Sequence, residues 1–333
     1  MKRALAWGKL RAMRRSRLAF AVLALFSPVF AVSVAASCGA RSELYDETFE
    51  PEEEDAGDDA PPDVMDAPPD VPDAPPDVMD APPDVPEDAL PPCEPDLLYI
   101  YLVTSETDLY RYRPDTGVFN LVGNLSCPSG GSPFSMGVSR TGFAYVIYND
   151  GSLFKVNTAN AECESTDWLP GTGGFNTFGM GYALNDDMMG ETLHVAEINF
   201  QDISMGLATI DTNTFELDYI GPFSENPGNA AELTSSDDGN LYGYFLNGNG
   251  SGGVIVEIDK TTAEIKSKIP LPAGSSSSAL AFAYWGGDFY VFTSEGNSET
   301  TVTRYKPSDS SVSVVATLNR TVVGAGVTTC TIP

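Results

Sequence analysis

The sequence predicts an all-β fold, a five-bladed β-propeller built from four-stranded blades. Three short patterns recur through residues 97–333 at a spacing of about 47 residues, and each alternates apolar and polar side chains as a β-strand does. Turns rich in Gly, Asp and Asn separate the patterns, and nothing over this span has a convincing helical period. Four strands repeated at this spacing are typical of propeller blades.

Each of the three patterns is present in five copies. The first is a strand that ends in a polar turn, found at 109–117, 153–161, 207–215, 255–263 and 302–310. The second carries an aromatic residue, with the copies Tyr99, Tyr145, His194, Tyr242 and Tyr290. The third is rich in small residues and is centred on Gly137, Gly181, Glu232, Ala281 and Gly326. A fourth strand follows the polar turn, for example at 119–122, 163–168 and 312–318.

The order of the patterns predicts how the ring closes. The first repeat has no small-residue strand, and the last copy of that strand, Val323–Thr328, stands alone near the C-terminus. We therefore expect the C-terminal strand to complete the first blade, which leaves no open sheet edge between the first and last blades. The small-residue strands should be innermost, because residues such as Gly137 let five backbones approach a narrow axis.

Four cysteines follow Cys38, and an even number in an exported chain indicates two disulfides with three possible connectivities. Cys93 and Cys330 should lie at the same end of the closing blade, so we expect them to pair. Cys127 and Cys163 then pair by elimination, although the topology does not obviously bring them together. A chain with no Cys-x-x-Cys pair and one histidine is unlike a zinc protein, and we expect neither a metal nor a cofactor.

The N-terminus has the order of an export signal. Residues 1–37 hold seven Lys and Arg and no acid, and the apolar run 18–36 ends in small residues before Cys38. This ending resembles a bacterial lipobox, which implies cleavage before Cys38 and a diacylglycerol on its sulfur. Two alternatives stay open. One is ordinary cleavage after Ala36, which would release a secreted protein, and the other is an uncleaved anchor of 19 apolar residues.

Residues 38–92 are predicted to be a disordered linker. The stretch 38–96 holds 21 acids and one base, and a seven-residue Pro/Asp repeat starts at Pro61, Pro68, Pro75 and Pro82. Few apolar groups are present to offset the entropy of ordering, so no core forms. Proline-rich chains sample polyproline II, and 28 such residues reach on the order of 80 Å. The linker is therefore a tether between a lipid at Cys38 and a folded domain at 93–333.

The combination of the basic N-terminus, the segment 38–42, the Pro/Asp spacer and the segment 132–138 resembles a family of myxobacterial exported lipoproteins. The resemblance covers most of the chain but implies no functional residue, because members of that family generally have no assigned activity. Gly39, where other lipoproteins carry Asp, is compatible with outer-membrane sorting. The resemblance implies an outer-membrane or cell-surface location, with secretion as the alternative.

Candidate binding residues come from positions that break the repeat. Residues 97–333 carry 26 acids and 10 bases, which disfavours a nucleic-acid partner. His194 occupies an aromatic position and is interpreted as a packing residue. Glu232 is the one acid in the small-residue position, where it would hold a cation, water or a ligand, or make an internal hydrogen bond. Phe134, Phe175 and Phe178 lie in loops that would form a rim suited to a sugar or a peptide.

These observations predict a surface-displayed lipoprotein, monomeric and held to a membrane through Cys38, whose propeller binds a glycan or protein ligand. One alternative is a carbohydrate-active enzyme with Glu232 in its channel. Glycosidases need two or three carboxylates at defined separations and only one inner-strand position is acidic, so the enzyme is disfavoured and no catalytic residue is assigned. The other alternative is a structural component of the cell envelope.

Overall fold

The computed structural model describes residues 90, 93–199, 204–228, 231–247, 252–271, 279–296 and 299–330 of the 333-residue chain. The predicted signal peptide (1–37), Cys38 and the linker as far as residue 89 lie outside the described residues. Within those described there are twenty strands and two 3-10 helices, η1 (Pro95–Leu97) and η2 (Thr172–Gly174). No helix in this part of the chain is long and apolar enough to cross a membrane.

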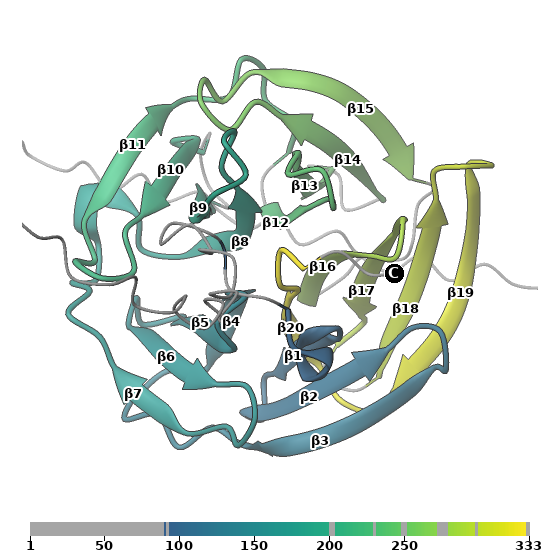
Figure 1. The fold of residues 1–333 in the computed structure, drawn as a ribbon, viewed down its shortest axis with the longest axis horizontal. Coiled ribbons are helices and arrows are strands. Elements are labelled where there is room, and N and C mark those ends of the chain that lie inside the picture. Colours follow the sequence, from purple (N-terminus) through teal and green to yellow (C-terminus); the bar gives the residue numbers. More distant parts are fainter. Residues whose placement is uncertain are drawn as a thin grey trace, which may run out of the picture. The chain divides into compact units, whose positions relative to one another are not determined.

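Five four-stranded antiparallel sheets surround a central axis, as the repeat predicts (Figure 1). From the axis outward, blade 1 contains β20 (Val322–Gly326), β1 (Ile100–Thr104), β2 (Asp108–Arg113) and β3 (Val118–Asn124). Blade 2 contains β4 (Pro133–Val138), β5 (Phe143–Tyr148), β6 (Leu153–Asn157) and β7 (Cys163–Ser165). Blade 3 contains β8 (Phe178–Leu184), β9 (Glu191–Glu197), β10 (Leu207–Ile210) and β11 (Leu217–Gly221). Blade 4 contains β12 (Ala231–Ser235), β13 (Leu241–Leu246), β14 (Gly253–Ile258) and β15 (Ile265–Leu271). Blade 5 contains β16 (Ala279–Trp285), β17 (Asp288–Ser294), β18 (Thr300–Lys306) and β19 (Ser311–Leu318).

The predicted closure is confirmed. Strand β20 pairs with β1 in an antiparallel register that joins Tyr101 to Gly326 and Leu102 to Ala325. The C-terminal strand therefore supplies the innermost strand of the first blade, and Figure 1 shows β20 between β4 and β16 at the centre of the ring. Because the first and last segments share one sheet, the ring cannot open without breaking a strand pairing.

The core lies between neighbouring blades and around the axis. Every residue of the innermost strand β8 is buried, whereas most residues of the outermost strand β19 are exposed. Glycine is required where two inner strands meet, since a Cβ at Gly179 would lie 1.8 Å from the carbonyl oxygen of Ala231 in the next blade. The small residues thus allow the close approach that the sequence predicts.

Both predicted disulfides are present. Cys93 and Cys330 are bonded at the seam of blade 1 with a Cα–Cα distance of 5.8 Å, and Cys127 is bonded to Cys163 at 5.3 Å. The second pair meets because the outer strand of blade 1 runs past the polar turn of blade 2. A Cβ built on Gly123 in β3 would lie only 3.0 Å from Ala161 Cβ, which brings Cys127 within reach of β7. Two disulfides are typical of an oxidising, non-cytoplasmic compartment.

Candidate functional site

The axis is closed by a side-chain bridge across the ring. Ser135 Oγ, on β4 of blade 2, donates a hydrogen bond of 2.7 Å to Glu232 Oε2, on β12 of blade 4. Both residues are buried, and blade 3 lies between their blades, so the bond spans the centre. Burial raises the pKa of Glu232 well above its ordinary value, and the Ser135 hydrogen bond offsets this only in part. The carboxyl group is therefore biased toward its neutral form.

This bridge gives the buried Glu232 an internal partner. Ser135 is the side chain whose hydrogen bond lowers the pKa of Glu232 against the effect of burial. Of the four roles that the sequence leaves open for Glu232, the internal hydrogen bond is the one that the geometry supplies.

The strand register corrects the position of Glu232 in the repeat. Tyr145, His194, Tyr242 and Tyr290 pair across their blades with Gly137, Gly181, Thr234 and Ala283. The corresponding aromatic residue of blade 1 is Tyr101 rather than Tyr99, because Tyr101 pairs with Gly326. Glu232 lies two residues before Thr234, level with Ser135, Gly179, Ala281 and Gly324. It is still the one acid at a level of small residues, one step along the axis from the predicted level.

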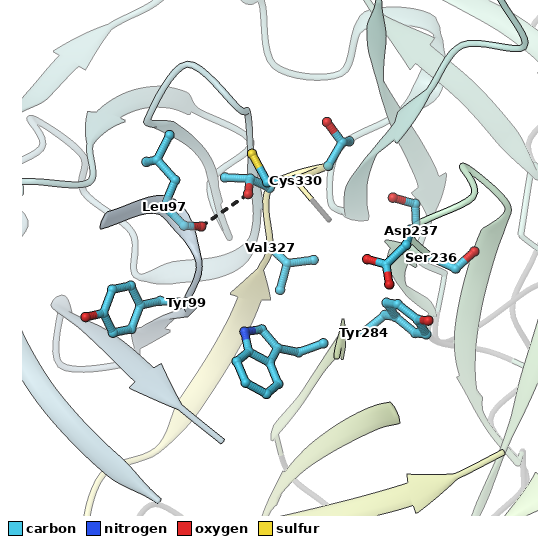
Figure 2. A pocket seen from close by; sticks show the side chains of 11 residues that line it. Leu97, Tyr99, Ser236, Asp237, Tyr284, Val327 and Cys330 are labelled. Carbon is cyan, nitrogen blue, oxygen red and sulfur yellow. Dashed lines mark hydrogen bonds between the residues drawn. The ribbon is translucent and has the colours of Figure 1, made fainter. Parts of the chain in front are cut away.

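The C-terminal tail covers one mouth of the axis. Thr328 Oγ1 donates to the Leu97 carbonyl oxygen at 3.2 Å, and Thr329 Oγ1 donates to Glu191 Oε2 of blade 3 at 2.7 Å. The pocket left beside the tail, with Tyr99, Asp237, Tyr284 and Val327 around it in Figure 2, has a volume of only about 10 Å³. Such a space holds about one water molecule, so this mouth is too small for a sugar.

His194 is a buried packing residue. It is 4% exposed, lies in β9 between Gly181 and Thr209, and its ring Nδ1 lies 3.1 Å from the carbonyl oxygen of Thr192. Burial lowers its pKa to about 4, so the ring is neutral at pH 7. No group of three metal-binding side chains occurs in the described part of the chain. The interpretation of His194 as a substitute for Tyr therefore agrees with its surroundings.

The three phenylalanines do not form the exposed rim that the sequence predicts. Phe175 and Phe178 are fully buried, and Phe134 is partly buried against the same hydrophobic cluster. Trp168 explains their burial, because its ring packs at 5.7 Å on Phe178 and its Nε1 donates to the Gly151 carbonyl oxygen at 3.1 Å. Phe134 and Phe178 lie in β4 and β8 rather than in loops, and all three side chains pack in the cluster between blades 2 and 3.

Trp168 also shortens the outer strand of blade 2. The sequence predicts a strand at 163–168, but β7 ends at Ser165, and the next residue, Thr166, donates its hydroxyl to the Leu153 carbonyl oxygen at 2.6 Å. The other outer strands have 5 to 8 residues, whereas β7 has three. The chain leaves the blade early because the indole turns inward, and the residues that follow become one wall of a groove.

This groove is an open concavity between the residues that follow β7 and the outer part of blade 3. Its walls are Asp167, Leu169 and Thr172 after β7, and the segment 214–218 with Thr209 and Asp211 of blade 3. Its volume is about 870 Å³, within the range of about 300 to 1,000 Å³ that ligand sites occupy. Leu169 is 72% exposed on one wall. Unlike the axis, the groove has room and solvent access.

Phe215 contributes an aromatic edge to the groove from an unusual backbone position. It ends the polar turn of blade 3 with φ of 58°, a left-handed conformation that bulky residues rarely adopt. The same turn position in the other blades has a similar φ and holds Gly117, Ala161, Ala263 and Ser310. The ring packs at 6.3 Å on Tyr145 of blade 2. A large residue among four small equivalents is a signal in the sequence that marks this turn as different from the others.

Comparisons with known proteins assign no activity to the chain. No family model matches the chain, and no curated protein matches it. Among solved structures, it is similar to Kuenenia stuttgartiensis hydrazine synthase at 16% identity, with 64% of each chain covered and a TM-score of 0.36. It is also similar to a Bacteroides thetaiotaomicron protein of unknown function at 15% identity, covering 66% of this chain and 57% of that one, with a TM-score of 0.41. An exo-β-1,3-galactanase from Phanerochaete chrysosporium matches at 11% identity over 66% of this chain and 54% of its own, with a TM-score of 0.42. The chain thus spans between 54% and 64% of the lengths of these proteins, and similarity at this level transfers no chemistry.

Proposed function

We propose that the chain is an exported lipoprotein, anchored through Cys38 at the outer membrane or cell surface, whose propeller is a non-catalytic binding module. The observation that carries the binding function is the contrast between a sealed axis and an open groove. Glu232 and Ser135 fill the centre, and the tail covers one mouth, whereas blade 3 presents about 870 Å³ of accessible space. The two disulfides support export, because such bonds persist in oxidising compartments.

A binding screen decides whether the groove or the axis carries this function. The mature chain is tested on a glycan array and a displayed peptide library beside two variants. Leu169→Ser combined with Phe215→Gly removes the apolar walls of the groove, and glycine suits the left-handed backbone at 215. Glu232→Gln keeps the buried shape and removes the acid. We expect the groove variant to lose binding and Glu232→Gln to retain it, and the reverse pattern would restore the channel carboxylate as the functional group.

The anchor has a separate test. Cys38→Ala removes the sulfur that would carry the lipid, so we expect the protein to move from the membrane fraction to the soluble fraction. Retention of the variant in membranes would refute lipidation and favour the uncleaved apolar segment at 18–36. Release of the wild-type chain into the medium would instead favour the secreted alternative.

A further inference from the structure

The charge of the groove indicates what kind of ligand it takes. Four of its lining residues are acids, Asp167, Asp211, Glu216 and Asp218, and no base lines it among the described residues. None of the four makes an ion pair within the described part of the chain, whereas six other acids of the propeller do. Four unpaired carboxylates on one concave surface repel one another, and a cationic ligand would relieve this repulsion.

The acids of the groove are exposed, and Asp211 is held in its charged form. Asp211 accepts hydrogen bonds from the backbone N–H groups of Asn213 and Thr214, and these bonds lower its pKa. Asp167, Glu216 and Asp218 are exposed like Asp211, so all four carboxyl groups face solvent along the groove.

Apolar side chains lie among these charges. Leu169 is 72% exposed, and Phe215 and Leu217 are half-buried in the wall opposite it. A small polyamine would satisfy the carboxylates but leave Leu169 in water. A neutral glycan would leave the four carboxylates without a counter-charge. An occupant that matches both features alternates cationic and apolar side chains.

We infer that the groove on blade 3 binds an extended basic peptide segment, with its Lys or Arg side chains on the carboxylates and an apolar side chain against Leu169 and Phe215. This inference rests on the proposed function and specifies its ligand class. The ring of Phe215 is part of the groove lining and packs on Tyr145 of blade 2, so its position is fixed before a ligand binds.

The test uses three labelled decapeptides, of alternating Lys and Leu, alternating Lys and Ser, and alternating Glu and Leu. Binding to the mature chain is followed by fluorescence anisotropy in about 150 mM salt, where long-range attraction between exposed charges is screened. We expect the Lys/Leu peptide to bind, the Lys/Ser peptide to bind more weakly, and the Glu/Leu peptide not to bind. Failure of the Lys/Leu peptide to bind, or equal binding of all three, would overturn the inference.

A charge-matched pair of variants separates the groove from the general acidity of the protein. Asp167→Asn, Glu216→Gln and Asp218→Asn together remove three of the four acids of the groove, whereas Glu106→Gln, Glu264→Gln and Glu299→Gln remove three exposed charges elsewhere. We expect Lys/Leu binding to weaken about tenfold in the groove triple and to stay within about twofold in the control. Equal losses in the two triples would mean a non-specific charge effect and would overturn the inference.

The same variants keep the inference distinct from the proposed function. If the glycan array or an uncharged peptide gives binding that the Leu169→Ser/Phe215→Gly variant loses, the groove is a binding site and only the basic ligand is wrong. If no glycan or peptide binds in a way that depends on the groove, the proposed function fails together with the inference.

Discussion

The bond between Cys93 and Cys330 should contribute more to stability than any other single covalent feature of the propeller. It joins the chain that enters blade 1 to the tail that leaves it, with a sequence separation of 237 residues, whereas Cys127 and Cys163 are separated by only 36. A cross-link restricts the unfolded chain, and the restriction grows with the logarithm of the loop that it closes. The two bonds in one domain therefore allow a direct comparison of long and short loops.

The loop lengths give the expected magnitudes. The chain-entropy relation yields about 5.5 kcal/mol at 25 °C for the long loop and about 3.8 kcal/mol for the short one. For a domain of this size, 1 kcal/mol changes the melting temperature by roughly 2 to 4 °C. Replacing Cys93 and Cys330 by Ser should lower Tm by about 11 to 22 °C, and the same change at Cys127 and Cys163 by about 8 to 15 °C. Both values are upper estimates, because an unfolded chain that retains structure has less entropy to lose.

The assay is urea and thermal unfolding of the two double-Ser variants beside the oxidised wild type. Near-ultraviolet circular dichroism tests whether each variant keeps native packing, and we expect that it does because the pairing of β20 with β1 involves neither Cys93 nor Cys330. The order of the two losses is the critical result. A larger loss for the Cys127/Cys163 variant would refute the view that the long-range bond acts by closing the ring in the unfolded chain.

Three further predictions concern the core. Glu232→Gln should flatten the pH dependence of stability, because the raised pKa means that folded Glu232 keeps a proton that the unfolded chain releases above about pH 4.5. The wild-type free energy of unfolding then falls by about 1.4 kcal/mol per pH unit until the folded pKa is reached. If urea unfolding between pH 5 and 8 gave the same pH dependence for the wild type and the variant, this prediction would be contradicted. His194→Phe should make the protein more resistant to unfolding by acid, because the unfolded histidine gains its proton below its ordinary pKa of 6.5 and the folded one only near 4. Between these two values the wild type loses about 3 kcal/mol of stability that the variant keeps. Equal urea midpoints of the wild type and the variant at pH 4 would count against this prediction. Gly179→Ala should cost about 3 kcal/mol or more, because its Cβ would meet the Ala231 carbonyl oxygen, whereas Gly130→Ala, with nothing within 4 Å of a new Cβ, should stay within about 0.5 kcal/mol in the same urea assay.

The architecture was predictable because it depends on order along the chain. A missing strand at the start of the repeat and a spare strand at its end define the closure without any knowledge of side-chain contacts, and the pairing of Tyr101 with Gly326 confirms it. The Cys93–Cys330 bond follows from the same topology. The register within a blade was less accessible, because the strand twist and bulges that set it are weakly encoded locally, and a shift of two residues moved Glu232 to another level.

The candidate site was harder to predict because it depends on which way a few large side chains turn. Phe175 and Phe178 belong to a loop by sequence, yet both are buried where Trp168 packs between blades. Loop residues are exposed only if no apolar neighbour offers burial. Here the free energy gained by burying the indole of Trp168 outweighs the strand pairing that residues 166–168 would have made at the edge of the blade. The shortening of β7 and the groove that follows from it are therefore consequences of tertiary packing.

The proposed function divides the propeller between a sealed axis and a binding groove, and this division assigns structural roles to the residues that break the repeat. Glu232, His194 and the paired cysteines break the repeat because the ring must be filled and fastened at its axis and at blade 1. The groove arises instead between blades 2 and 3, where the outer strand β7 of blade 2 ends early and Phe215 of blade 3 lines the opposite wall. Closure of the ring stabilises every blade, so the residues that line the groove are not needed for the stability of the fold. Their acidic and apolar character is then free to reflect a ligand, and for this reason the charge of the groove says more about function than the buried acid at the centre.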